Sequence, residues 1–229
     1  MHPAARGRIV PGVRIETFIF DFDGTLADTL PICIGAYRRA LEINTGRTYT
    51  DEEIVAHFGL NEEGILRQMA PHCWQQCVRD FLTAYEDLHD TVQPLPGVRE
   101  MLDELKAMGA RLALVTGKGG ESARISLERL GLTGCFDAVE VGNPERNMKA
   151  DQIRTLLETS GTPGQRAAYV GDSPSDMDSA REAGVLSLAA AWFESADPAA
   201  LESRNPAAIF RTLEEFLDWA RKRVGGKGG

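Results

Sequence analysis

Two aspartates follow a short apolar run near the beginning of this 229-residue chain, in the stretch FIFDFDGTLADT. The run Phe18–Phe20 predicts a buried strand, so that Asp21 lies at its C-terminal end and Asp23 two residues further on. In open α/β sheets, ligands bind at that edge. A buried carboxylate without a partner costs several kcal/mol, or its pKa shifts until it is neutral. The two carboxylates therefore need a counter-charge, for which a divalent metal is the obvious candidate.

Further polar candidate residues occur at the ends of later predicted strands and at the starts of predicted helices. Thr116 and Gly117 follow the apolar run RLALV, Lys149 precedes a helix in RNMKAD, and GDSPSD contains Asp172 and Asp176. Taken singly, each has an ordinary structural explanation as a turn, a helix cap or a solvated lysine. Their joint occurrence, in order, around the strand ends of one sheet indicates a single site.

Strands and helices alternate from about residue 97 onward. The predicted strands are RLALVT, FDAVEV, AAYVGD and VLSLAA, with a final helix near residues 212–223. The helices between them end at glycines, which are typical just past a helix end; these are Gly109, Gly131, Gly161 and Gly184. Such alternation implies a parallel sheet covered on both faces. The fold class is therefore α/β, a doubly wound, Rossmann-like parallel sheet.

Residues 28–93 interrupt this alternation with helical patterns alone. The TDEE segment beginning at Thr50 has the signature of a capping box, and Asn61 followed by two glutamates predicts another helix start. We therefore expect a small all-helical cap domain over residues 28–93 and an α/β core made of residues 1–27 and 94–229. An insert placed directly after the first strand, at the ligand edge, is well placed to act as a lid.

These motifs together resemble the haloacid dehalogenase-like superfamily, and most closely its phosphoglycolate phosphatase-type branch with a small helical cap. The resemblance is carried by DFDGTLADT and VGDSPSDMDSAREAG and covers nearly the whole chain. It implies a hydrolase, a phosphatase that uses Mg²⁺ and cleaves a small phosphate monoester through an aspartyl-phosphate intermediate.

The resemblance implies a role for each aspartate. Asp21 would be the nucleophile and Asp23 the general acid and base, while Mg²⁺ would be held by Asp21, the backbone carbonyl of Asp23, and Asp172. The chemistry itself needs such groups, because a phosphate dianion repels a carboxylate nucleophile until a hard cation neutralises that repulsion. A carboxyl group can also give the leaving alkoxide a proton and later accept one from water.

The transferring phosphoryl group would be bound by Thr116, the Gly117 amide and Lys149, while Asp176 would support the metal water or orient Lys149. A cation opposite the metal and a hydroxyl donor stabilise charge on the equatorial oxygens. At the position of Gly117 the superfamily often has asparagine, so here only a backbone amide is offered. Arg146 lies three residues before Lys149 and is the alternative phosphate-binding cation.

Other functions remain as alternatives. Within the superfamily these are a pyrophosphatase and a sugar-phosphate mutase, although mutases usually carry a histidine where this chain has Cys33. Outside it, a non-enzymatic module that binds a phosphate ligand is the main alternative. The loop TGKGGES resembles a dinucleotide-binding loop only superficially, because Ser122 takes the place of the third glycine.

The sequence indicates the identity of the substrate less clearly than it indicates the fold or the catalytic residues. Polar candidates for specificity in the cap are His57, Asn61 and Arg67. Glu62 and Glu63 are expected to serve the dipole of their helix. If they face the site, they would disfavour a substrate with a second anionic tail, phosphoglycolate included.

Composition excludes several other classes of partner. A net charge of −9 argues against general electrostatic binding of nucleic acid. No apolar run approaches the ~20 residues of a membrane span, and MHPAARGRIVPG lacks the apolar region of a secretory signal. We expect a cytoplasmic monomer or homodimer with four reduced cysteines, acting on a small phosphorylated metabolite, with no nucleic acid or membrane partner.

Overall fold

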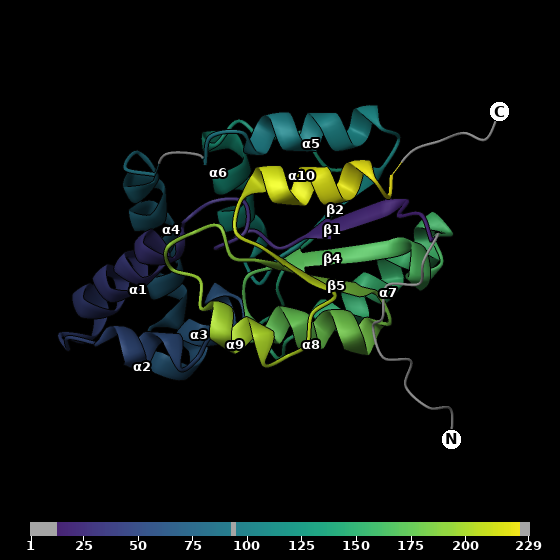
Figure 1. Cartoon of the computed structure of the whole chain (residues 1–229). Helices are drawn as coiled ribbons and strands as arrows, with labels where there is room; N and C mark the ends of the chain where they lie inside the picture. The colour runs from purple at the N-terminus through teal and green to yellow at the C-terminus, as the bar shows by residue number, and fades with distance from the viewer. Residues whose placement is uncertain (1–12, 93–94, 225–229) are drawn as a thin grey trace, which may run out of the picture.

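The computed structural model describes residues 13–92 and 95–224. Its centre is a parallel sheet with strand order β3-β2-β1-β4-β5-β6 (Figure 1). The strands are β1 (Thr17–Phe20), β2 (Arg111–Val115), β3 (Ala138–Glu140), β4 (Ala167–Gly171), β5 (Leu186–Ala190) and β6 (Ala208–Phe210). Because β1 pairs with both β2 and β4, the residues that follow these three strands meet at one edge.

Helices cover both faces of the sheet, as the sequence predicts. Phe18 and Phe20 face α5 (Val98–Ala107) and α10 (Leu213–Arg221), where they join the largest apolar cluster. Ile19 points to the opposite face and packs with α7 (Lys149–Ser160) and α8 (Pro174–Ala183). Figure 1 shows α5 and α10 on one side of the sheet and α7 and α8 on the other. β1 is therefore buried on both faces, which places its C-terminal carboxylate inside the protein.

Between β1 and α5, the described residues form four helices in the segment expected to be the cap. They are α1 (Leu30–Thr45), α2 (Asp51–Val55), α3 (Glu62–Met69) and α4 (Trp74–His89). They enclose an apolar cluster of their own, centred on Tyr37, Phe81 and Tyr85. The expected caps are present: Thr50 makes a capping box at α2, and the Asn61 side chain accepts from the Gly64 N–H at α3. The second apolar cluster supports a separate cap, but the domain boundaries stay a prediction, and residues 93–94 lie outside the described residues.

The C-terminal third differs from the sequence expectation. The expected last strand, VLSLAA, is β5, but it is followed by a short helix, α9 (Pro198–Glu202), and by β6, which adds to the edge of the sheet. Helix α6 (Gly120–Arg129) follows β2 as expected. Three residues of β6 are too few to show alternation, and α9 is a single short segment, so neither leaves a periodic signal.

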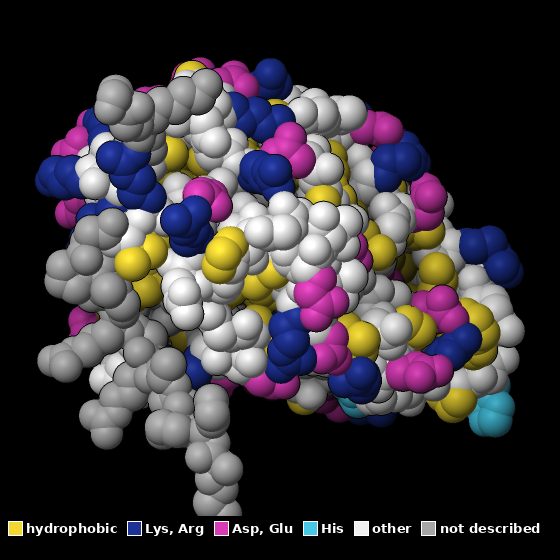
Figure 2. Space-filling view, turned by 90° about the vertical axis from the view of Figure 1, so that its right-hand side faces the viewer, with side chains coloured by type: hydrophobic (Ala, Val, Ile, Leu, Met, Phe, Trp, Pro, Cys, Tyr) yellow, Lys and Arg dark blue, Asp and Glu magenta, His cyan; other side chains and the backbone are white. Residues whose placement is uncertain are grey.

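On the face of the molecule shown in Figure 2, basic and acidic side chains are interspersed, and neither charge forms a separate patch. The described residues also form exposed ion pairs, such as that of Arg166 with Glu16. Among the described residues, no helix is both long and apolar enough to traverse a bilayer. The N-terminal stretch of residues 1–12 and the tail of residues 225–229 lie outside the described residues.

Candidate active site

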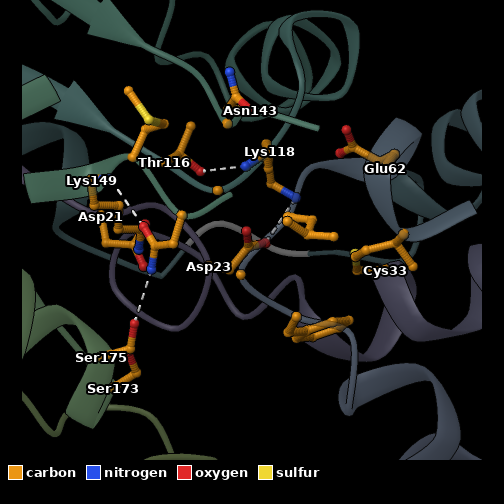
Figure 3. Close-up of a pocket in the computed structure, with 18 of the residues that line it drawn as sticks. Asp21, Asp23, Cys33, Glu62, Thr116, Lys118, Asn143, Lys149, Ser173 and Ser175 are labelled. Atoms are coloured by element: carbon orange, nitrogen blue, oxygen red, sulfur yellow. Dashed lines mark hydrogen bonds and ion pairs between the residues drawn. The ribbon is translucent and has the colours of Figure 1, made fainter. Parts of the chain in front are cut away.

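The carboxyl end of β1 is the centre of the site. Asp21 is only 6% exposed, and its N–H donates to the carbonyl of Val170 on β4 at 2.9 Å, which continues the pairing of the two strands. Thr116 follows β2 on one side and Asp172 follows β4 on the other. The three sequence-predicted residues therefore line one pocket, together with Asp23 (Figure 3).

Lys149 and Asp176 complete this arrangement from two helix starts. Lys149 Nζ lies 3.0 Å from Asp21 Oδ1 and 2.6 Å from Asp176 Oδ1. Asp176 is fully buried, and its other oxygen accepts from the N–H and hydroxyl of Ser173. Arg146, the alternative cation, is exposed and pairs with Asp151. Lys149 thus contacts both Asp21 and Asp176, and the orienting role expected for Asp176 stays a prediction.

Three carboxylates in the site could hold a cation. Oxygens of Asp21, Asp172 and Asp176 lie within 4.8 Å of one another. Burial raises the pKa of Asp21 to about 7, with the neighbouring carboxylates adding to the rise and Lys149 opposing it. Burial and then Asp176 also raise the pKa of Asp172 well above its usual range.

The donor set fits a divalent cation. Asp21 Oδ1 is buried and accepts no hydrogen bond with good geometry from the described residues. Gly24 keeps the approach to Asp172 free, because a Cβ there would lie 2.1 Å from its Oδ2. Carboxylate oxygens are the ligands that Mg²⁺ prefers. A 2+ ion would supply the positive charge that one lysine does not provide for three carboxylates.

Lys118 is a residue of the site to which the sequence pattern, although it places this lysine at the end of the second strand, assigned no role. Its side chain is 2% exposed, and Nζ lies 2.8 Å from Asp23 Oδ1 and 2.6 Å from the hydroxyl of Tyr85 on α4. The Thr29 hydroxyl donates to the same carboxylate oxygen. Burial alone would lower the pKa of Lys118, but Asp23 and Tyr85 raise it well above its usual range. Its position directly after Thr116-Gly117 could have indicated a role in the site. Lysine side chains are seldom buried, however, so a surface position was the ordinary expectation.

Thr116 and Gly117 lie in the loop that follows β2 and line the pocket together with Asp21. Thr116 is fully buried, and its hydroxyl accepts from the Lys118 N–H at 3.2 Å. Both residues line the pocket beside Lys149. The loop that follows β2 therefore places Thr116 and Gly117 in the same pocket as Asp21.

The cap docks on the core through the N-terminus of α3. Glu62 accepts from the Gly119 N–H at 2.7 Å and from the Ser122 hydroxyl. The Asn61 side chain donates to the carbonyl of Gly142 at 3.1 Å. Gly64 packs so closely against the Pro144 backbone that a Cβ would lie 2.2 Å from the Pro144 oxygen. These contacts hold the cap over the loops that follow β2 and β3.

The chain matches the family model described as haloacid dehalogenase-like hydrolase over residues 18–190. The chain belongs to this family. It is 32% identical over 183 residues to "Putative pyrophosphatase PpaX" of Caldanaerobacter subterraneus subsp. tengcongensis, covering 79% of this chain and 83% of that protein. It is 30% identical over 224 residues to a phosphoglycolate phosphatase of Pseudomonas savastanoi pv. phaseolicola, covering 92% of this chain and 81% of that one.

A solved structure supports the fold. The crystal structure of a predicted phosphoglycolate phosphatase from Haemophilus somnus 129PT superposes with a TM-score of 0.76 at 22% identity, covering 91% of this chain and 99% of that one. At this identity the likeness concerns the fold alone. The haloacid dehalogenase-like fold expected from the motifs is confirmed.

The cap residues chosen from the sequence, His57, Asn61 and Arg67, are not among the residues that line the pocket, and their role in specificity stays a prediction. His57 Nδ1 lies 2.9 Å from Gln68 Oε1, and Asn61 is used as a helix cap. Arg67 pairs with Glu63 and lies over the ring of Trp74. The cap residues that do line the pocket are mainly apolar or aromatic, and they include Leu30, Cys33, Tyr37, Phe58, Leu60 and Ile65. Each of the three polar side chains has a partner within the cap, whereas the face that meets the pocket depends on how the cap docks on the core.

Proposed function

We propose that this family member is a Mg²⁺-dependent phosphatase that hydrolyses a small phosphate monoester through an aspartyl phosphate on Asp21. The observation that carries the proposal is the contact of buried Asp21 with Lys149, with Thr116 and Asp172 on the adjacent strand ends. This arrangement combines a nucleophile, a cation for the phosphoryl oxygens and further carboxylates for a metal. The names of the two relatives, a phosphatase and a pyrophosphatase, support a phosphate substrate.

In the first half of the reaction, an Asp21 oxygen attacks phosphorus and the bond from phosphorus to the leaving oxygen breaks. Asp23 acts as the general acid and gives a proton to the leaving alkoxide. The Thr116 hydroxyl, the Gly117 N–H and Lys149 bind the equatorial phosphoryl oxygens. Mg²⁺, held by Asp21, Asp172 and the carbonyl of Asp23, would neutralise the repulsion between the carboxylate and the phosphate dianion.

In the second half, the Asp23 carboxylate takes a proton from water as that water attacks the phosphorus of the acyl phosphate. Orthophosphate leaves and the Asp21 carboxylate is restored, so atoms and charge return to their starting state. Lys118 and Thr29 hold Asp23 two residues from the nucleophile, where it can serve both halves.

Hydrolysis is favoured over phosphoryl transfer between sugar hydroxyls. Cys33 lines the pocket where sugar-phosphate mutases usually carry a histidine, and burial raises its pKa well above the usual range, so the thiol is a poor acid or base. Pyrophosphate remains the second candidate substrate because of the PpaX relative. A cytoplasmic location and a monomeric or homodimeric state remain part of the proposal.

The test is metal-dependent turnover of an aryl phosphate by the full chain. Activity should disappear in chelator and return with Mg²⁺, while Ca²⁺ should substitute poorly because its shell is larger and looser. Asp21→Asn should abolish turnover of every substrate, since an amide cannot form the acyl phosphate. Full activity in chelator, or substantial turnover by Asp21→Asn, would refute the proposal. A non-enzymatic module would bind phosphate in Mg²⁺ without turning over any ester.

A further inference from the structure

The pocket has two chemically different walls. The core side presents Asp21, Thr116 and Lys149 to the phosphoryl group. On the cap side, the lining residues other than Gly59 and Glu62 are here called the cap wall; they are Leu30, Cys33, Tyr37, Phe58, Leu60 and Ile65. In Figure 3, Cys33 and Glu62 lie across the pocket from Asp21 and Lys149. A leaving group that projects away from Asp21 therefore meets mainly carbon and a neutral thiol.

The described pocket lining holds no uncommitted cation. It contains two lysines, and each is already paired with carboxylate: Lys149 with Asp21 and Asp176, and Lys118 with Asp23. Arg67 and Arg146 are exposed and paired with acidic residues outside the lining. A second anionic group on the substrate would find no free positive partner among these residues.

The charged residue that the cap contributes to the described lining is negative. Glu62 is 6% exposed, and its two oxygens accept from the Gly119 N–H and the Ser122 hydroxyl. An anionic tail reaching the cap would approach this carboxylate in a partly enclosed space, where like-charge repulsion is weakly screened. An uncharged tail would instead bury apolar surface against the cap wall.

We propose, resting on the phosphatase function above, that the substrate is a phosphate monoester of a small, uncharged, largely apolar alcohol. 2-Phosphoglycolate is then a poor substrate, in contrast to the names of several relatives. The cavity of about 300 Å³ is at the lower end of the ~300–1,000 Å³ of ligand pockets, so phosphate and leaving group must both be compact. Cap-wall residues, with Phe58 at the rim, determine this preference.

The first experiment compares three esters of similar shape with the Mg²⁺-loaded full chain: 2-phosphoglycolate, its neutral amide, and isobutyl phosphate. Released orthophosphate gives kcat/KM for each. The kcat/KM for isobutyl phosphate should exceed that for 2-phosphoglycolate by at least about tenfold, which is within the discrimination that one pocket contact provides. The amide should also exceed 2-phosphoglycolate, because it keeps the shape and removes the charge.

The second experiment adds a cation to the cap wall. Phe58 is 37% exposed, so Phe58→Arg is compatible with folding and places a guanidinium at the pocket. It should raise the kcat/KM ratio of 2-phosphoglycolate to isobutyl phosphate at least about tenfold. Val55→Arg is the matched control, because Val55 is 43% exposed on the same segment but does not line the pocket. The control should leave the ratio unchanged.

The outcomes separate this inference from the function on which it rests. If an aryl phosphate is hydrolysed but isobutyl phosphate is no better than 2-phosphoglycolate, the specificity inference is overturned and the phosphatase proposal stands. The specificity inference is also overturned, and the phosphatase proposal also stands, if Phe58→Arg and Val55→Arg change the kcat/KM ratio of 2-phosphoglycolate to isobutyl phosphate equally. If neither the aryl phosphate nor any of the three esters is hydrolysed in Mg²⁺, the phosphatase proposal fails, and the inference fails with it.

Discussion

Lys118 Nζ lies 2.8 Å from Asp23 Oδ1 in a position where the lysine side chain is almost completely enclosed. The same ammonium donates to the Tyr85 hydroxyl on cap helix α4, so a single buried cation links the proposed acid–base residue to the cap. An ion pair with this burial and these hydrogen bonds holds both partners in one geometry. We therefore expect Lys118 to act as a positioning residue for Asp23.

Replacing this lysine should impair proton transfer more than binding. In Lys118→Met the apolar stem is kept and the ammonium is lost, so Asp23 is held by Thr29 without its cation. We expect kcat for an alkyl phosphate to fall about 10²-fold, at the lower end of the general acid–base contribution. An aryl phosphate with an activated leaving group should lose much less in its phosphorylation step, which rapid-quench kinetics measures.

Lys106→Met is the control, since Lys106 lies outside the pocket and pairs with Asp137. Its kinetics should match the wild type. Equal losses on alkyl and aryl phosphates in the phosphorylation step of Lys118→Met would contradict a positioning role through Asp23 and indicate a general structural defect.

Asp23→Asn should separate the two halves of the reaction. An activated aryl phosphate should still phosphorylate Asp21, because its leaving group needs no proton. Water attack then lacks its base, so the aspartyl phosphate should accumulate and be visible by intact mass. Metal binding should persist, since the proposed ligand from Asp23 is its backbone carbonyl. Normal hydrolysis of alkyl phosphates by Asp23→Asn would show that the assigned role is wrong.

Gly64→Ala should disturb cap docking. A Cβ at Gly64 would lie 2.2 Å from the Pro144 oxygen, so α3 or the loop after β3 must move. Because α3 carries Ile65 of the cap wall, we expect KM for an aryl phosphate to rise several-fold, with a loss of about 1–3 kcal/mol in the free energy of unfolding. Gly120→Ala, which meets open space at the start of α6, should leave KM unchanged. Unchanged KM in Gly64→Ala would contradict this account of docking.

His89 should make the protein acid-sensitive. Its side chain is 2% exposed, with Nε2 3.0 Å from the Ser126 hydroxyl, and burial, followed by the Lys118 charge, lowers its pKa to about 4. The unfolded chain gains a proton below about pH 6.5, whereas the folded chain does not until about pH 4. The stability is therefore complete above about pH 6.5 and lost as the pH falls, by at most about 3 kcal/mol over this window.

Urea unfolding of the wild type and His89→Gln between about pH 7 and pH 4.5 measures this effect. The variant should lose less of its free energy of unfolding as the pH falls, although it starts from a lower value. His72→Gln, at an exposed position, should retain the wild-type slope. Parallel pH profiles for the wild type and His89→Gln would rule out His89 as the cause.

The strand-end residues could be predicted because their positions depend on local sequence and on one topological rule. Apolar runs predict β1, β2 and β4, and parallel strands end at the same edge, so Asp21, Thr116 and Asp172 had to lie near one another. Lys149 and Asp176 followed from the same rule, since each opens a helix that leaves this edge. The carboxylates of the proposed metal site belong to this predictable part.

Contacts between cap and core were decided only by the tertiary structure. The sequence pattern shows that Glu62 begins a helix, but not that its carboxylate binds Gly119 and Ser122 more than fifty residues away. In the same way, nothing local indicates that Lys118 is buried, because its partner Tyr85 comes from the cap. Periodicity identifies the apolar face of a helix, but which residues of that face meet a pocket depends on the angle at which the cap docks.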